Sequence, residues 1–144
     1  WAQKVDELLQ SDAQIYIELE PEFNASSNSI TIETTTEILE SISASLSLNV
    51  ILTESHIIAY QTDYDAEPQE IADYEHNHVM RKSLTGSWGL DLGKSGYNNG
   101  DIISNSFSLT LDEEWVVENM SVVAFVSNTN SYQVIQAEET YIME

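Results

Sequence analysis

Residues 120–126 read Met-Ser-Val-Val-Ala-Phe-Val, and this stretch decides the fold class. Every second residue from Met120 to Val126 is apolar, which is the period of a β-strand whose successive side chains point to opposite faces. Two of the intervening residues, Val123 and Phe125, are apolar as well. The stretch therefore predicts a central strand that is covered on both faces.

Other parts of the chain show the same alternation and are separated by turn residues. These segments are 15–19, 30–36, 46–52, 56–62, 103–111 and 134–142. Pro21 is expected to end the first strand, because proline cannot donate a ladder hydrogen bond. About seven or eight such strands predict an all-β fold, an antiparallel β-sandwich of the immunoglobulin-like kind.

Two regions depart from this pattern. Residues 1–10 place Trp1, Val5, Leu8 and Leu9 on one stripe of a short N-terminal helix, which must pack on this domain or on a neighbouring one. Residues 63–100 show no sustained strand pattern and are expected to form a long insertion. Connections of that length are often functional.

Composition excludes several classes of function. The 144 residues fit one domain, and 25 acidic against 4 basic residues give a net charge of −21. A phosphate-contacting nucleic-acid binder needs a basic face, so no nucleic-acid partner is expected. The absence of cysteine excludes disulfides, thiolate zinc sites and cysteine nucleophiles. No apolar run approaches the ~20 residues of a membrane span, and no signal peptide is visible.

The segment 73–82 gathers two of the three histidines and two of the four basic residues. On a strand, His76 and His78 would share a face and, with Asp73, could bind a metal ion. Two histidines do not complete a tetrahedral site. The alternative is structural, with Arg81 paired to carboxylates as a brace between this segment and the rest of the domain.

Residues 84–100 contain all five glycines together with Trp88 and Tyr97. Aromatic residues among glycine and asparagine are typical of binding loops, and we expect both rings at a loop tip. They could equally be lids over the end of the sandwich. The run is not a phosphate-binding P-loop, because Trp88 stands where that motif requires glycine.

Acidic clusters at 63–67 and 112–114 suggest calcium binding. The first has the Asp-x-Asp start of an EF-hand, but Pro68 and Tyr74 replace its required glycine and glutamate. A looser surface calcium site remains open. Because the chain also lacks a nucleophile elbow and a zincin motif, we expect no enzymatic activity.

At this point several strings resemble a known family. The strings are 52–61, 74–81 (Tyr-x-His-Asn-His-Val-x-Arg), 86–89 (Gly-x-Trp-Gly), 122–126 and 134–137. They resemble the outer-membrane-protein-28 (Omp28) family of Bacteroidetes over about residues 12–144, and the string at 74–81 is the specific one.

The resemblance implies an exported surface lipoprotein in which a thioredoxin-like domain precedes a β-sandwich domain. Residues 1–11 would then be a helix and linker from the upstream domain, and residues 12–144 the sandwich. A lipid anchor outside this fragment would hold the protein at the outer membrane or cell surface. The family offers no catalytic residues to carry over.

The leading hypothesis is a non-catalytic binding, adhesion or accessory module whose partner is a protein or glycan at the cell surface. Its expected contact residues are Tyr74, His76, His78, Arg81, Trp88 and Tyr97. One alternative is a calcium or zinc site that uses His76, His78 and Asp73; no other cofactor is expected. A second alternative is a purely structural domain that packs on the thioredoxin-like neighbour.

Overall fold

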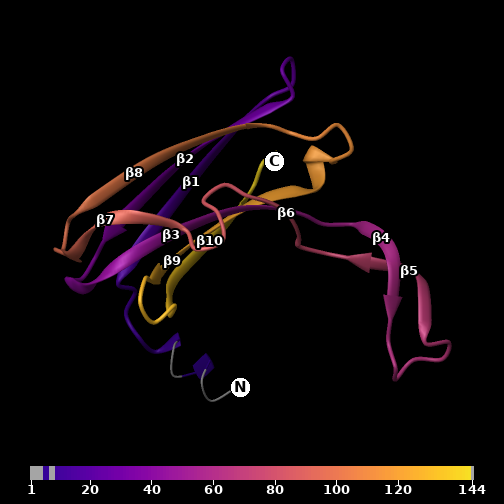
Figure 1. Ribbon diagram of the computed structural model, residues 1–144, viewed down its shortest axis with the longest axis horizontal. Helices are drawn as coiled ribbons and strands as arrows, with labels where there is room; N and C mark the ends of the chain where they lie inside the picture. Colours follow the sequence, from indigo (N-terminus) through magenta and orange to yellow (C-terminus); the bar gives the residue numbers. More distant parts are fainter. Residues whose placement is uncertain (1–4, 7–8, 144) are drawn as a thin grey trace.

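The computed structural model describes residues 5–6 and 9–143, and within them the chain is built from ten β-strands (Figure 1). The strands are β1 (Ile15–Asn24), β2 (Ser29–Ile38), β3 (Ile42–Glu54), β4 (Ile57–Thr62), β5 (Glu70–His76), β6 (Val79–Ser83), β7 (Leu90–Tyr97), β8 (Ile102–Thr110), β9 (Met120–Asn128) and β10 (Val134–Tyr141). A single 3-10 turn, η1 (Val117–Asn119), precedes β9.

The first sheet has three antiparallel strands in the order β1-β2-β8. Its edge strand β1 runs on to Asn24, with Pro21 paired opposite Ile32, so the prediction that Pro21 ends the strand is wrong. The reason is topological: β1 is the edge strand of its sheet and pairs with β2 alone, and proline is tolerated on an edge strand.

The second sheet is organised around the long strand β3. Along one edge, β3 pairs with β9 from Leu46 to Glu54, and β10 continues the sheet beyond β9. Along its other edge, β3 pairs first with β7 and then with β6. The central position predicted for residues 120–126 is therefore confirmed.

Both sheets contribute to one hydrophobic core. The first sheet supplies Ile15, Ile17, Ile30, Ile32 and Ile38, and the second supplies Leu46, Leu48, Val50, Leu52, Met120, Val122, Ala124 and Val126. Each fully buried side chain of this size contributes roughly 1.5–3 kcal/mol through the area it removes from water. The all-β, antiparallel class expected from the alternation is confirmed.

Strands β4 and β5 form a separate two-stranded sheet that projects away from the other strands (Figure 1). We call residues 57–76 the arm. None of its residues is buried. A lone two-stranded sheet is only marginally stable in water, so the arm depends on the contacts at its base.

The region 63–100 differs from the expected unpatterned insertion, because it contains β5, β6 and β7. These strands have mostly exposed side chains and, in β7, glycines at Gly93 and Gly96. The alternation of apolar residues that marks a half-buried strand is therefore missing from their sequence.

The predicted helix over residues 1–10 falls largely outside the described residues and stays a prediction. Across the part of the chain that the structure describes, no helix is long and apolar enough to cross a membrane.

Candidate functional site

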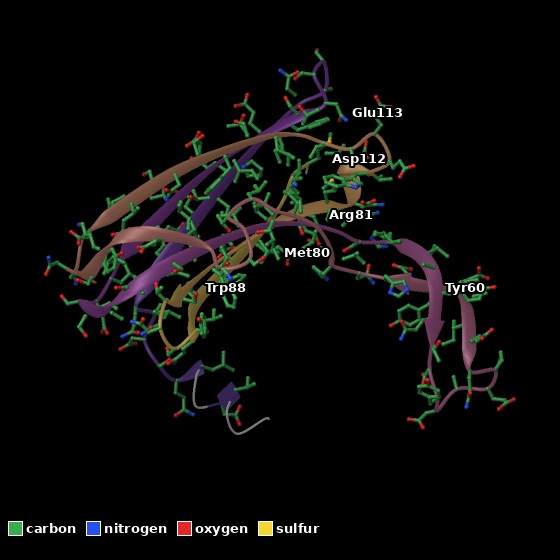
Figure 2. The ribbon with its side chains drawn as sticks, viewed as in Figure 1. Tyr60, Met80, Arg81, Trp88, Asp112 and Glu113 are labelled. Carbon is green, nitrogen blue, oxygen red and sulfur yellow. The ribbon has the colours of Figure 1, made fainter. Side chains whose placement is uncertain are left out.

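A six-residue loop, 84–89, interrupts the pairing along one edge of β3. Ser83 pairs with Ile51 and Leu90 pairs with Leu48, so six residues stand opposite only two of β3. The loop must therefore bulge out from the sheet, and it carries Trp88 (Figure 2).

Hydrogen bonds hold both the start and the turn of this loop. The backbone N–H of Leu84 donates to the carbonyl oxygen of Val50 at 2.9 Å, and the N–H of Val50 donates to the hydroxyl of Thr85 at 3.1 Å. The hydroxyl of Ser83 donates to the carbonyl oxygen of Gly86 at 2.9 Å. The loop is thus pinned to β3 rather than free.

The turn between β9 and β10, residues 129–133, is held by one asparagine. The side-chain oxygen of Asn128 accepts the backbone N–H groups of Asn130 and Ser131 at 2.9 and 3.1 Å. Its backbone oxygen accepts the N–H of Tyr132 at 2.9 Å. Tyr132 adopts a left-handed conformation with φ of 59°, which turns its side chain out of the strand direction.

The same turn is tied to β3. The N–H of Thr129 donates to the carbonyl oxygen of Ser45 at 3.0 Å, and the hydroxyls of Thr129 and Ser47 lie 2.8 Å apart. The turn is thus tied to the first half of β3 and loop 84–89 to Val50 in its second half, so both rest on the same strand.

This arrangement brings Trp88 and Tyr132 together. Their ring centroids lie 5.6 Å apart with an interplanar angle of 42°, within the range of favourable aromatic pairs. Trp88 is 76% exposed and Tyr132 is 65% exposed. We call these two side chains the aromatic platform, and loop 84–89 and turn 129–133 the platform loops.

The two segments that carry the platform are uncharged, which is unusual in this chain. Residues 83–90 and 120–137 contain no Asp, Glu, Lys or Arg, although the chain carries a net charge of −21. A hollow of about 440 Å³ begins at Gln133, beside Tyr132, and its lining includes Asp12 and Glu40. The platform itself thus offers apolar rings, hydroxyls and amides.

The expected contact residue Trp88 lies on the surface, whereas Tyr97 does not. Tyr97 is 2% exposed and belongs to the core, so the prediction that it sits at a loop tip is wrong. Its hydroxyl donates to the carbonyl oxygen of Lys94 at 3.2 Å. Burial raises the pKa of Tyr97 above its usual value.

Tyr132 is not among the contact residues that the sequence predicts. Its turn, Asn-Thr-Asn-Ser-Tyr-Gln, has the aromatic and small polar composition that singles out loop 84–100. This composition marks the turn as a candidate binding loop, but only the pairing of β3 with β9 shows that the turn and loop 84–89 meet.

Arg81 braces the segment after the arm, as the structural interpretation expects. Its Nε donates to Oε2 of Glu54 at 2.7 Å, and the other oxygen of Glu54 accepts the N–H of Val116 at 3.2 Å. Glu54 is 3% exposed. Arg81 is thereby engaged within the domain rather than offered to a partner.

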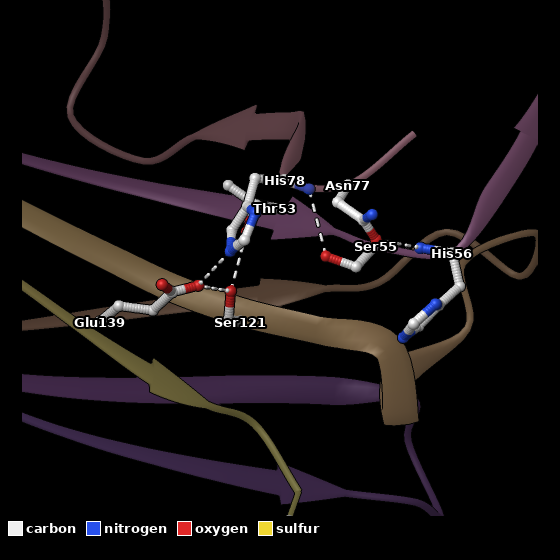
Figure 3. A network of polar contacts seen from close by, with 7 residues as sticks. All are labelled: Thr53, Ser55, His56, Asn77, His78, Ser121 and Glu139. Carbon is white, nitrogen blue, oxygen red and sulfur yellow. Dashed lines mark hydrogen bonds and ion pairs between the residues drawn. The ribbon is translucent and has the colours of Figure 1, made fainter. Parts of the chain in front are cut away.

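Asn77 and His78, in the middle of the specific string 74–81, lie at the base of the arm beside Ser55 and His56 (Figure 3). The N–H of His56 donates to the side-chain oxygen of Asn77 at 3.1 Å, and the N–H of His78 donates to the hydroxyl of Ser55 at 3.1 Å. Both histidines have positive φ, 61° and 53°. These reciprocal bonds join the strand that enters the arm to the strand that leaves it.

Each histidine of the base also meets a carboxylate. His56 Nδ1 lies 2.6 Å from Glu75 on β5, and His78 Nε2 lies 3.2 Å from Glu139 on β10. Glu139 also accepts the hydroxyl of Ser121 on β9 (Figure 3). His78 therefore links the arm's base to the second sheet.

His76 and His78 do not act as a pair. His76 packs edge-on against Tyr74, with centroids 4.8 Å apart, while His78 contacts Glu139. Among the described residues, no three His, Asp or Glu side chains gather in a way that could hold a metal ion. The metal site with Asp73 stays a prediction without a supporting cluster.

In each acidic cluster, one aspartate stabilises the turn in which it lies. Asp63 accepts the N–H of Asp65 at 3.0 Å, and Asp112 accepts the N–H of Glu114 at 3.0 Å. Asp112 and Glu113 lie on the connection from β8 to η1 (Figure 2). These local bonds account for the Asp residues as turn formers.

Comparison with solved structures supports the fold. The chain is similar to a domain of the outer membrane lipoprotein Omp28 from Porphyromonas gingivalis, with 20% identity over 91% of this chain and 97% of that one and a TM-score of 0.63. It is also similar to Spo0M, a sporulation control protein from Bacillus subtilis, with 10% identity over 92% of this chain and 49% of that one and a TM-score of 0.55. At these identities the likeness shows the fold alone.

Comparison with curated proteins gives no significant match. In the comparison with protein families, outer membrane protein Omp28 matches residues 1–144, the whole length of the chain. This protein therefore belongs to the Omp28 family of outer membrane proteins.

Proposed function

We propose that this domain is a non-catalytic binding or adhesion module that contacts its partner through the aromatic platform. The Omp28 family is a family of exported, outer-membrane-associated proteins, so the domain works at a surface. The observation that carries the proposal is the exposed pair of Trp88 and Tyr132 on loops that are pinned to β3. Rings held in this way lose little conformational entropy when they bind.

The platform also fits the energetics of binding sites. Tryptophan and tyrosine dominate the contact energy at recognition surfaces, because each buries a large area with few rotatable bonds. Two such rings, side by side and open to solvent, offer apolar area that a partner can bury. The scaffold beneath them is part of the proposal: an immunoglobulin-like sandwich, supported by two antiparallel sheets that share one core.

The test compares three versions of the purified domain on immobilised probes. The probes are polysaccharides, glycans and extracellular proteins such as fibrinogen and collagen. The versions are the natural chain, Trp88→Ala, and Tyr64→Ala as a matched control, since Tyr64 is 80% exposed on the arm.

Saturable binding by the natural chain and by Tyr64→Ala, lost in Trp88→Ala, supports the proposal. Equal binding by all three versions, or no saturable binding to any probe, overturns it. Melting curves check that the variants are folded.

The two alternatives stay predictions with their own measurements. A calcium or zinc site would raise the melting temperature in a chelator-reversible way, and His78→Ala would remove the effect. A structural interface through the N-terminal segment has one favourable observation: Val5 and Leu9 are exposed beside a hollow of about 340 Å³ that β10 lines. Slower proteolysis near residue 11 in the natural protein than in the isolated domain would support it.

A further inference from the structure

We propose that the ligand of the aromatic platform is a neutral glycan, bound by stacking of a sugar ring on Trp88 and Tyr132. This inference rests on the proposed function and names its ligand class.

The platform is open enough for a ligand to lie against its rings. The two rings are tilted by 42° and lie 5.6 Å apart, and both are largely exposed. They form an open surface rather than a closed pocket. A pyranose ring presents an apolar face of C–H groups that is about as wide as an aromatic ring. Aromatic side chains that expose a flat apolar face cover such a surface well.

The rim of the platform offers neutral hydrogen-bonding groups. The platform loops carry Ser87, Asn130 and Ser131 next to the two rings in sequence, and Gln133 follows Tyr132. Hydroxyl and amide side chains both donate and accept, as sugar hydroxyls do. An apolar centre with a few polar groups around it is the usual composition of a small-molecule site.

The charge around the platform selects against ionic ligands. Residues 83–90 and 120–137 contain no charged side chain, so the platform loops themselves supply no cation to hold a phosphate, sulfate or uronate. The net charge of −21 repels anions further. A cationic ligand would be attracted by that charge, but neither platform loop contains a carboxylate to neutralise it. A neutral ligand needs neither a cation nor a carboxylate from the platform loops.

The experiment follows Trp88 directly by ¹⁹F NMR. The natural chain is labelled with 5-fluorotryptophan, and the Trp88 resonance is assigned with Trp88→Phe. The probes are neutral oligosaccharides (linear glucose and mannose hexamers), an oligogalacturonate hexamer, choline chloride, and any protein that the natural chain binds among the immobilised probes.

Neutral oligosaccharides are expected to shift the Trp88 resonance saturably. The dissociation constant should change little between about 50 mM and about 500 mM NaCl, because no ion pair is screened. Tyr132→Ala should weaken binding about tenfold, since it removes one of the two rings. Tyr64→Ala should bind as the natural chain does.

The other outcomes overturn the inference and separate it from the proposed function. If choline or a protein shifts Trp88 and no neutral oligosaccharide does, the glycan assignment fails while the platform remains a binding surface. If only oligogalacturonate binds, the platform takes an anionic sugar and the assignment to a neutral glycan fails. If no probe of any class shifts Trp88, the inference and the proposed function fail together.

Discussion

At the scale of single residues, Glu54 and Arg81 form the most consequential ion pair. Glu54 is 3% exposed, and it is held by one of only four basic residues in the chain. A carboxylate buried to this degree is tolerated because Arg81 and the N–H of Val116 both donate to it. The pair joins the end of β3 to β6, just beyond the arm.

Arg81→Met should therefore destabilise the domain by about 2 to 3 kcal/mol, because it leaves a buried carboxylate without its cation. Urea unfolding measures the loss. The double variant Arg81→Met with Glu54→Gln should recover part of it, and Lys82→Met on the exposed face of β6 should change stability by less than about 0.5 kcal/mol. A loss in Arg81→Met no larger than in Lys82→Met would contradict the brace.

Tyr97 links stability to alkaline pH. Burial is the main cause that raises the pKa of its hydroxyl above the ordinary value, so the folded state holds the proton more tightly than the unfolded state. The stability that this pKa difference contributes is fully present below the pKa of the unfolded state, near 10. It is lost as the pH rises through the higher pKa of the folded state. Stability should fall above about pH 10.

Tyr97→Phe should flatten this alkaline decline, while costing about 1 kcal/mol at neutral pH through the lost bond to the Lys94 carbonyl. Urea unfolding between neutral and alkaline pH measures both effects. Tyr141→Phe, at a tyrosine 63% exposed on β10, is the control and should leave the curve unchanged. An alkaline decline as steep in Tyr97→Phe as in the natural chain would rule this explanation out.

At the scale of elements, Gly89 lets loop 84–89 return to β3. Its φ is 80°, and a Cβ there would lie 2.8 Å from the side-chain nitrogen of Asn49 and 2.9 Å from the carbonyl oxygen of Leu48. The backbone oxygen cannot move aside without disturbing β3. Gly93 on β7 has a similar φ of 83° but open space around it.

Gly89→Ala should cost about 3 kcal/mol, from the positive φ and the close contact together. Gly93→Ala should cost only about 1 kcal/mol, from φ alone. Melting temperature and urea midpoint measure the difference between the two. Equal losses would mean that the close approach of loop 84–89 to β3 is not as described.

The arm should be the least stable element. None of residues 57–76 is buried, and its strands pair only with each other, whereas β3 pairs along both edges. Its amides are expected to exchange with solvent through local opening, and those shared by β3 and β9 only through global unfolding. Hydrogen exchange followed by NMR tests this, and equal protection of both regions would show that the arm is not independent.

At the scale of the whole molecule, net charge opposes folding. A charge of −21 on one compact domain is self-repulsive, and dissolved salt screens repulsion between exposed groups. Raising NaCl should therefore raise the melting temperature, by about 3 °C for each 1 kcal/mol of relieved repulsion. Potassium chloride at the same ionic strength should act equally. A rise given only by calcium chloride would instead indicate a specific calcium site.

The sequence determines much of this protein through local rules. Alternation of apolar residues reports burial of one strand face, so the strands of the core, the central place of residues 120–126 and the all-β class follow from it. The string at 74–81, which carries the resemblance to the family, includes residues that make specific bonds at the base of the arm and to β3. Composition also places Trp88 in an exposed loop, which the structure confirms, and its role as a contact residue stays a prediction.

The tertiary structure alone decided which of the candidate residues meet. Tyr97 and Trp88 look alike in the sequence, but β7 packs Tyr97 into the core while the loop beside it lifts Trp88 into solvent. Tyr132 becomes the partner of Trp88 because β3 and β9 pair antiparallel and bring residues 44 positions apart in the chain together. Such encounters depend on strand pairing across the whole chain, and no local pattern of residues encodes them.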